Sequence, residues 1–119
     1  MIKLSDAEWK IATALWENSA MTITELTRFF ESDTGWGKNT IITLLKRMEE
    51  KDAVGFIQED RAKRFFSKID RTDAVIEETS SFLDKVYSGN VGLMLSALIK
   101  SDKLSKDDIE ELQRILEEG

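Results

Sequence analysis

Polar residues between positions 38 and 47 have the types and the spacing needed to contact DNA. Apolar residues recur there at helical spacing, so residues 38–51 are expected to form one amphipathic helix. Asn39 and Thr43 lie on its opposite face, and their short side chains can hydrogen-bond to base edges in a major groove. The pattern indicates a recognition helix, although this stretch alone fits an ordinary structural helix with a polar outer face more simply. The apolar stripe consists of Ile41, Leu44, Leu45 and Met48.

Cationic residues accompany these polar side chains and suit the phosphate backbone. Lys46 and Arg47 lie beside the polar face, and Lys38 lies near the helix N-terminus, which itself attracts phosphate. Ile42 is an apolar residue on the same outer side. The residues of this helix that we expect to contact DNA are Lys38, Asn39, Thr40, Ile42, Thr43, Lys46 and Arg47.

Histidine and cysteine are both absent from the 119 residues. Their absence excludes disulfides, thiolate zinc sites, and catalysis by a Cys nucleophile or a His acid–base group. An enzyme that uses carboxylates or lysine stays formally open, but the sequence predicts no catalytic residue, no metal ligand and no cofactor site.

No segment predicts insertion into a membrane. The longest apolar run, Val91–Ile99, is far shorter than the roughly 20 residues that cross a bilayer. The first residues lack the hydrophobic region of a signal peptide. We therefore expect a cytoplasmic protein.

The charge of the chain is unevenly distributed. The net charge is −6, yet residues 36–68 carry 8 basic and 5 acidic side chains, whereas residues 69–119 carry 6 and 12. Because salt screens charges beyond about 10 Å, a local basic segment decides whether phosphates bind. The basic excess coincides with the expected recognition helix and the segment that follows it.

Two short helices are expected before the recognition helix. Ser5 and Glu8 form a capping box that opens a helix to about Asn18, and Thr22 and Glu25 open a second helix to about Glu31. Residues 32–35 have the composition of a turn. The second and third helices would then form a helix-turn-helix. The residues of the second helix that we expect to face inward are Ile23, Leu26, Phe29 and Phe30.

A β-hairpin is expected directly after the recognition helix. Residues 53–59 and 65–69 are rich in aromatic and β-branched residues, and they flank the charged turn 60–64. Such a hairpin is the wing of a winged helix. Its tip would carry Arg61, Lys63 and Arg64 toward phosphates or a minor groove. The alternative is an ordinary solvated tip.

The remaining residues predict three helices, over residues 70–88, 91–99 and from 105 onward. About fifty residues make only a thin core, so we expect a second copy to cover their apolar stripes. The fold class is therefore mainly α with a small β-hairpin wing, with a DNA-binding domain at 1–70 and a helical dimerisation domain at 71–119. In the last helix Ile109, Leu112, Ile115 and Leu116 should face inward. The expected dimer contacts are Val75, Thr79, Phe82, Leu83, Val86, Tyr87, Leu95, Leu98, Leu112 and Leu116.

Residues 36–48 closely resemble the signature W-[ST]-x-x-T-[IV]-x-T-L-[IL]-x-R-L of the BlaI/MecI/CopY repressors. The matching residues are Trp36-x-x-Asn39-Thr40-Ile41-x-Thr43-Leu44-Leu45-x-Arg47-Met48. Segments 4–9, 14–16, 82–89 and 104–112 are similar to further parts of the family. The resemblance therefore covers nearly the whole chain.

This resemblance implies a winged helix followed by a helical dimerisation domain, in a homodimer that represses genes from palindromic operator DNA. Those genes are of the β-lactamase or copper-homeostasis type. In the β-lactam branch it also implies a membrane-bound sensor with a metalloprotease domain, which triggers cleavage of the repressor. The cleaved Asn–Phe bond of that branch aligns with Ala97 and Leu98, the candidate cleavage site in this chain.

The chain departs from the family pattern at informative positions. Gly37 and Lys38 stand where the family often has Ser or Thr followed by Pro. Ile42 stands where Arg or Lys often contacts a base, and it can touch a thymine methyl but cannot donate to guanine. The absence of cysteine excludes copper sensing through a Cys-rich motif.

Three functions are compatible with these features. The first is a homodimeric transcriptional repressor. The second is a winged-helix module that binds protein and not DNA, which the acidic total and Ile42 favour. The third is an unrecognised hydrolase, against which the missing His and Cys argue.

Overall fold

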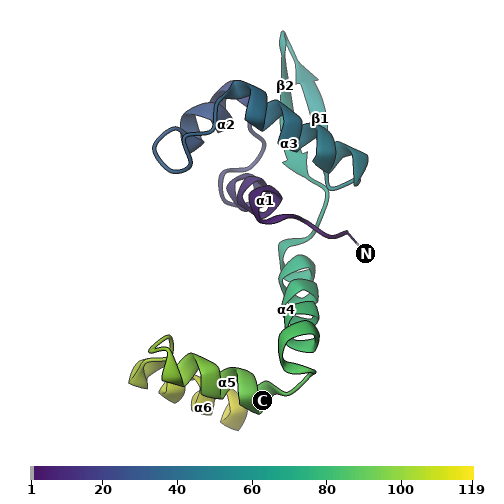
Figure 1. The fold of residues 1–119 in the computed structure, drawn as a ribbon. Coiled ribbons are helices and arrows are strands. Elements are labelled where there is room, and N and C mark those ends of the chain that lie inside the picture. Colours follow the sequence, from purple (N-terminus) through teal and green to yellow (C-terminus); the bar gives the residue numbers. More distant parts are fainter. Residues whose placement is uncertain (1) are drawn as a thin grey trace. The chain divides into compact units, whose positions relative to one another are not determined.

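The structure, a computed structural model, describes residues 2–119 and divides the chain into two compact units (Figure 1). The first unit extends to Asp73 and the second spans Ala74–Gly119. Six helices and one antiparallel hairpin in the described residues confirm the predicted fold class. The first unit contains α1 (Asp6–Asn18), α2 (Ile23–Phe30), α3 (Lys38–Glu50), β1 (Val54–Glu59) and β2 (Ala62–Ser67). Helix α4 (Arg71–Tyr87) crosses the boundary, and α5 (Val91–Lys100) and α6 (Lys106–Glu118) follow it.

Reciprocal side-chain caps begin the first two helices, as predicted. The Ser5 hydroxyl accepts from the Glu8 N–H at 3.2 Å, and the Glu8 carboxylate accepts from the Ser5 N–H at 2.7 Å. Thr22 and Glu25 form the same pair of bonds at the start of α2, at 3.1 and 2.9 Å. Each pair satisfies backbone N–H groups that a helix leaves free at its N-terminus.

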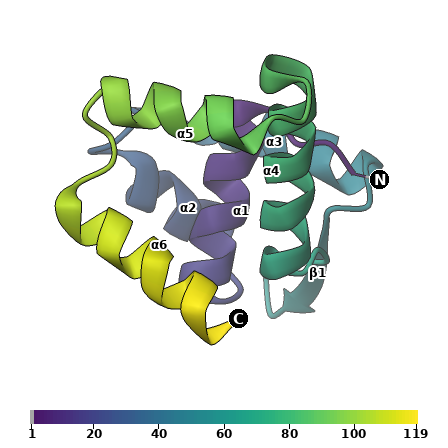
Figure 2. The same ribbon diagram turned by 90° about the horizontal axis from the view of Figure 1, so that it is seen from below.

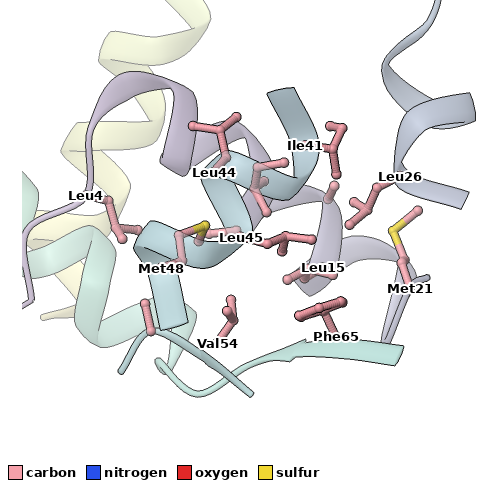
Figure 3. Close-up of a cluster of buried hydrophobic side chains, with 14 of the residues drawn as sticks. Leu4, Leu15, Met21, Leu26, Ile41, Leu44, Leu45, Met48, Val54 and Phe65 are labelled. Carbon is pink, nitrogen blue, oxygen red and sulfur yellow. The ribbon is translucent and has the colours of Figure 1, made fainter. Parts of the chain in front are cut away.

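The inward face of α3 carries the predicted apolar stripe, and all four of its residues are buried. Figure 3 shows Ile41, Leu45 and Met48 in the cluster that also contains Val54 of β1 and Phe65 of β2. Packing of this stripe against α1, α2 and the hairpin fixes which side of α3 faces the solvent. The N-cap residue Gly37 has no side chain to cap with, so α3 begins without a side-chain hydrogen bond at its N-cap.

The hairpin turn is tighter than predicted. Strand β2 begins at Ala62, which pairs with Glu59, so the turn contains only Asp60 and Arg61 instead of residues 60–64. Asp60 adopts a φ of 48°, a left-handed conformation that Asp tolerates in turns. Lys63 and Arg64 therefore lie in a strand and not at the tip. Phe65 extends the pairing on its other side, because it exchanges backbone hydrogen bonds of 3.0 and 2.8 Å with Met21.

One inward expectation for α2 is wrong. Phe30 is buried, whereas Phe29 is 43% exposed. The buried residues of α2 are Leu26 and Phe30, which lie four positions apart on one face, and the turn of about 100° per residue leaves Phe29 at the edge of that face. Phe29 instead contacts the edge of Phe30, with ring centroids 5.0 Å apart.

The second unit is a set of helices joined by short connections (Figure 2). Gly89, with a φ of 81°, follows the end of α4, and Ser105 with Asp108 forms a capping box at the start of α6. No residue within α5 or α6 is buried. The inward expectation for α6 is therefore wrong within one chain: Ile115 is 53% exposed and Leu116 is 80% exposed. None of the helices in residues 2–119 combines the length and the apolar character needed to cross a bilayer.

Candidate nucleic-acid interface

All seven residues predicted to contact DNA from α3 are exposed on its outer surface. The burial of Leu44 and Leu45 in the core leaves Asn39, Thr43 and Lys46 together on the opposite side of the helix. Ile42 is 38% exposed beside them. The exposed outer residues of α3 are Lys38, Asn39, Thr40, Ile42, Thr43, Lys46 and Arg47.

Thr43 has its hydroxyl hydrogen committed within the helix. Its Oγ1 donates to the carbonyl oxygen of Asn39 at 2.9 Å, which is the usual back-bond of a threonine four residues along a helix. The hydroxyl oxygen can still accept a hydrogen bond, and the methyl group can still make apolar contacts. This bond uses only the backbone carbonyl of Asn39, so the side-chain amide of Asn39 can bind other partners.

Five of the exposed cations of the first unit are predicted DNA contacts that have no carboxylate partner in the described residues. Within residues 2–119, the structure shows no carboxylate within 4.0 Å of the charged groups of Lys38, Lys46, Arg47, Arg61 and Lys63. Lys63 lies over the ring of Phe56, with Nζ 4.2 Å from the centroid. That contact places the ammonium group over the ring, and Lys63 as a residue stays exposed.

Arg64 differs from the other wing cations, because two carboxylates accept hydrogen bonds from its guanidinium group. Its Nη1 donates to Glu25 at 2.9 Å and to the Ala20 carbonyl at 3.2 Å, and its Nε donates to Glu59 at 2.7 Å. The hydrogen bond to Glu59 and the charge of Glu25 raise the pKa of Arg64 above its usual value. The backbone N–H of Thr22 and the charge of Arg64 lower the pKa of Glu25. Arg64 thus connects the wing to the first turn of α2.

A shallow cavity of about 460 Å³ brings together residues that are distant in the sequence. Its cations are Lys38 from the start of α3 and Arg61 and Lys63 from the wing. Thr24 and Gln58 also line it, and neither was among the predicted site residues. No signal in the sequence pointed to Gln58, and the cap at Thr22 indicated only that α2 begins beside Thr24. The remaining lining residues are Thr22, Ile23 and Ala62.

A charged pair fixes the far end of α3. Lys51, directly after the helix, donates to the Lys3 carbonyl at 2.9 Å and to the carboxylate of Glu8, which is 1% exposed. Burial alone would raise the pKa of Glu8, but the hydrogen bonds from Lys51 and Ser5 outweigh it and lower that pKa. The C-terminal end of α3 is thereby held against α1 and the N-terminal segment.

The residues predicted for dimerisation lie outside any buried core of the single chain. Phe82 is 47% exposed and Val86 is 49% exposed, while Leu83, Leu95 and Leu98 are half-buried. Ala97 and Leu98, the candidate cleavage pair, lie near the end of α5 and are both half-buried. The other predicted contacts are also exposed or half-buried: Val75, Thr79, Tyr87, Leu112 and Leu116.

Three short helices, a hairpin after the third, and an exposed polar face on that third helix together define a winged-helix DNA-binding domain. The family model described as "Penicillinase repressor" matches residues 4–118. The chain therefore belongs to the penicillinase repressor family, whose members are transcriptional repressors and not enzymes.

Known proteins of this family are similar along most of the chain. The penicillinase repressor of Bacillus licheniformis is 31% identical over 116 residues, which cover 98% of this chain and 91% of that protein. The methicillin resistance regulatory protein MecI of Staphylococcus aureus (strain N315) is 25% identical over 114 residues, covering 96% and 93%.

Two solved structures are similar to about three fifths of the chain. The DNA-binding domain of the repressor BlaI matches 60% of this chain and 88% of its own, at 28% identity and a TM-score of 0.55. The monomeric form of Bacillus licheniformis BlaI, in complex with the blaP half-operator, matches 61% and 90%, at 28% identity and a TM-score of 0.54.

Proposed function

We propose that this protein is a homodimeric transcriptional repressor that binds palindromic operator DNA with α3 in the major groove. The observation that carries the proposal is the outer face of α3, where Asn39 and Thr43 are exposed between cations without carboxylate partners in the described residues. Asn and Thr suit base edges, and Lys and Arg suit phosphates. The similarity to a BlaI structure that contains a half-operator supports the same use of this unit.

Phosphates of the flanking backbone would bind in the cavity between α2, α3 and the wing. Lys38, Arg61 and Lys63 supply three positive charges there, and the N-terminus of α2 adds its backbone N–H groups. We assign Arg64 a different part from the phosphate contact predicted from the sequence, because its Nη1 and Nε already donate to Glu25 and Glu59. Its part is to hold the wing against α2.

A second copy of the chain would cover the apolar residues of the second unit. Leu116, Ile115, Val86 and Phe82 expose between 47% and 80% of their surface in the single chain. A two-fold dimer uses the same patch on both copies and repeats the recognition helix on the DNA. A palindromic operator follows from that symmetry.

Repression takes place where the DNA is, so we propose a cytoplasmic protein. Cleavage between Ala97 and Leu98 would release the protein from the operator. A membrane-bound sensor metalloprotease would trigger this cleavage. Both residues are half-buried inside α5, so cleavage would require local unwinding of that helix. Digestion of the purified protein by the candidate protease, followed by mass spectrometry, tests the position of the cut.

Fluorescence anisotropy with labelled duplex DNA from upstream of the gene tests the proposed function. We expect binding that weakens steeply between about 50 and 200 mM salt, because phosphate contacts release counterions. A winged-helix module that binds only protein would show no salt-dependent affinity for any duplex. That result would overturn the proposal.

A further inference from the structure

Ile42 is an aliphatic residue on an otherwise polar surface. Its neighbours on the outer side of α3 are Asn39, three residues before it, and Lys46, four residues after it. Single exposed apolar residues are common on proteins, and Ile57 of β1 is more exposed, at 55% compared with 38%. What distinguishes Ile42 is its place between the polar side chains that would face the base edges.

The residue beside Ile42 offers no free hydrogen-bond donor. The Thr43 hydroxyl donates its hydrogen to the backbone carbonyl of Asn39, so Thr43 presents only a methyl group and an acceptor oxygen. Guanine shows two acceptors in the major groove and needs donors opposite them. Thymine shows a methyl group, which an aliphatic side chain can contact. The pair Ile42 and Thr43 therefore suits thymine and leaves guanine unsatisfied.

We propose that Ile42 reads the 5-methyl group of a thymine in each operator half-site. This inference rests on the proposed function, because it needs α3 in the major groove. The contact gives sequence discrimination by burying one methyl group and requires no hydrogen bond. The Thr43 oxygen next to it accepts a hydrogen bond from an exocyclic amino group, which adenine and cytosine present in the major groove and guanine does not.

Uracil in place of thymine tests the contact, because it removes only the 5-methyl group. Duplexes are first selected by the full-length protein from a random library, and each thymine of the selected site is then replaced singly. We expect one position in each half-site to lose about fourfold in affinity per replacement, the equivalent of about 0.8 kcal/mol for one buried carbon. Other thymines should change the affinity much less.

Two variants test whether Ile42 causes the loss of affinity when uracil replaces thymine. In Ile42→Ala the ratio of the affinities for thymine and uracil should fall to about one at that position, since about three carbons are removed from the contact. Ile57→Ala removes the same atoms from an isoleucine outside α3 and should keep the ratio. Both residues are exposed, so neither change removes a buried side chain, and a thermal melt confirms folding.

The outcomes separate this inference from the proposed function. Selective binding without any dependence on thymine methyl groups would overturn the role of Ile42 and leave the repressor proposal intact. The same conclusion follows if Ile42→Ala keeps the full preference for thymine over uracil. Failure to bind duplex DNA at low salt would overturn the proposed function itself.

Discussion

Arg47 is exposed at the flank of α3, and its guanidinium group has no carboxylate within 4.0 Å in residues 2–119. Arg47→Ala should weaken binding to every duplex sequence, because a phosphate contact carries no sequence information. The slope of log K against log salt should become shallower by about one. Anisotropy titrations at four salt concentrations measure the slope. An unchanged slope would place Arg47 away from the backbone.

Thr43 lies four residues before Arg47, but its substitution should affect a different quantity. Thr43→Ala removes the acceptor oxygen and the methyl group from the base-facing side, so discrimination between operator and unrelated DNA should fall by about 1–3 kcal/mol at most. Affinity for unrelated DNA should stay near that of the unmodified protein. Competition binding with both duplexes measures the difference, and Thr43→Val separates the hydroxyl from the methyl group.

Glu8 should make the stability of the first unit depend on pH. Its pKa lies below its usual value of 4.5 in the folded chain, so its contribution is fully present above pH 4.5. That contribution is lost as the pH falls through the lowered pKa. Glu8→Gln should cost about 1–3 kcal/mol near pH 7, because Lys51 and Ser5 lose a charged acceptor. Urea denaturation should show that the difference in unfolding free energy between Glu8→Gln and the unmodified protein narrows below pH 4.5.

Arg64 and Lys63 are neighbours in β2 with contrasting surroundings. Arg64→Gln removes the bonds to Glu25 and Glu59, so it should lower the melting temperature and loosen the wing. The salt dependence of DNA binding should not change. Lys63→Gln should leave the melting temperature nearly unchanged and make the salt slope shallower by about one. A salt slope that becomes shallower by about one in Arg64→Gln would show that Arg64 contacts a phosphate.

Local signals in the sequence predicted much of the fold and the exposure of the outer residues of α3. The capping boxes at Ser5 and Thr22 depend on residues three positions apart, and both are present. The outer face of α3 followed from the spacing of its apolar stripe. The register of the hairpin and the partners of Arg64 depend on β2 packing against Met21 and α2, a contact between distant segments that spacing does not show.

The second unit has apolar surface that one chain does not bury. Leu116 is 80% exposed in α6, and no residue of α5 or α6 is buried. A stable fold of about fifty residues rarely tolerates this, because small domains bury too little surface to offset chain entropy. Leu116, predicted both to face inward and to contact a second copy, is exposed in the single chain, as expected of a residue that a second copy would cover.

Leu116→Ser should therefore shift the equilibrium from dimer to monomer without unfolding the first unit. Sedimentation equilibrium measures the shift, and Glu117→Ser is the matched control one position along the same helix. Affinity for a single half-site should stay unchanged in Leu116→Ser, because the residues proposed to contact DNA all lie in the first unit. Affinity for the complete operator should fall, because two linked half-sites bind more tightly than one. An unaltered dimer, or equal losses on both duplexes, would place the interface elsewhere.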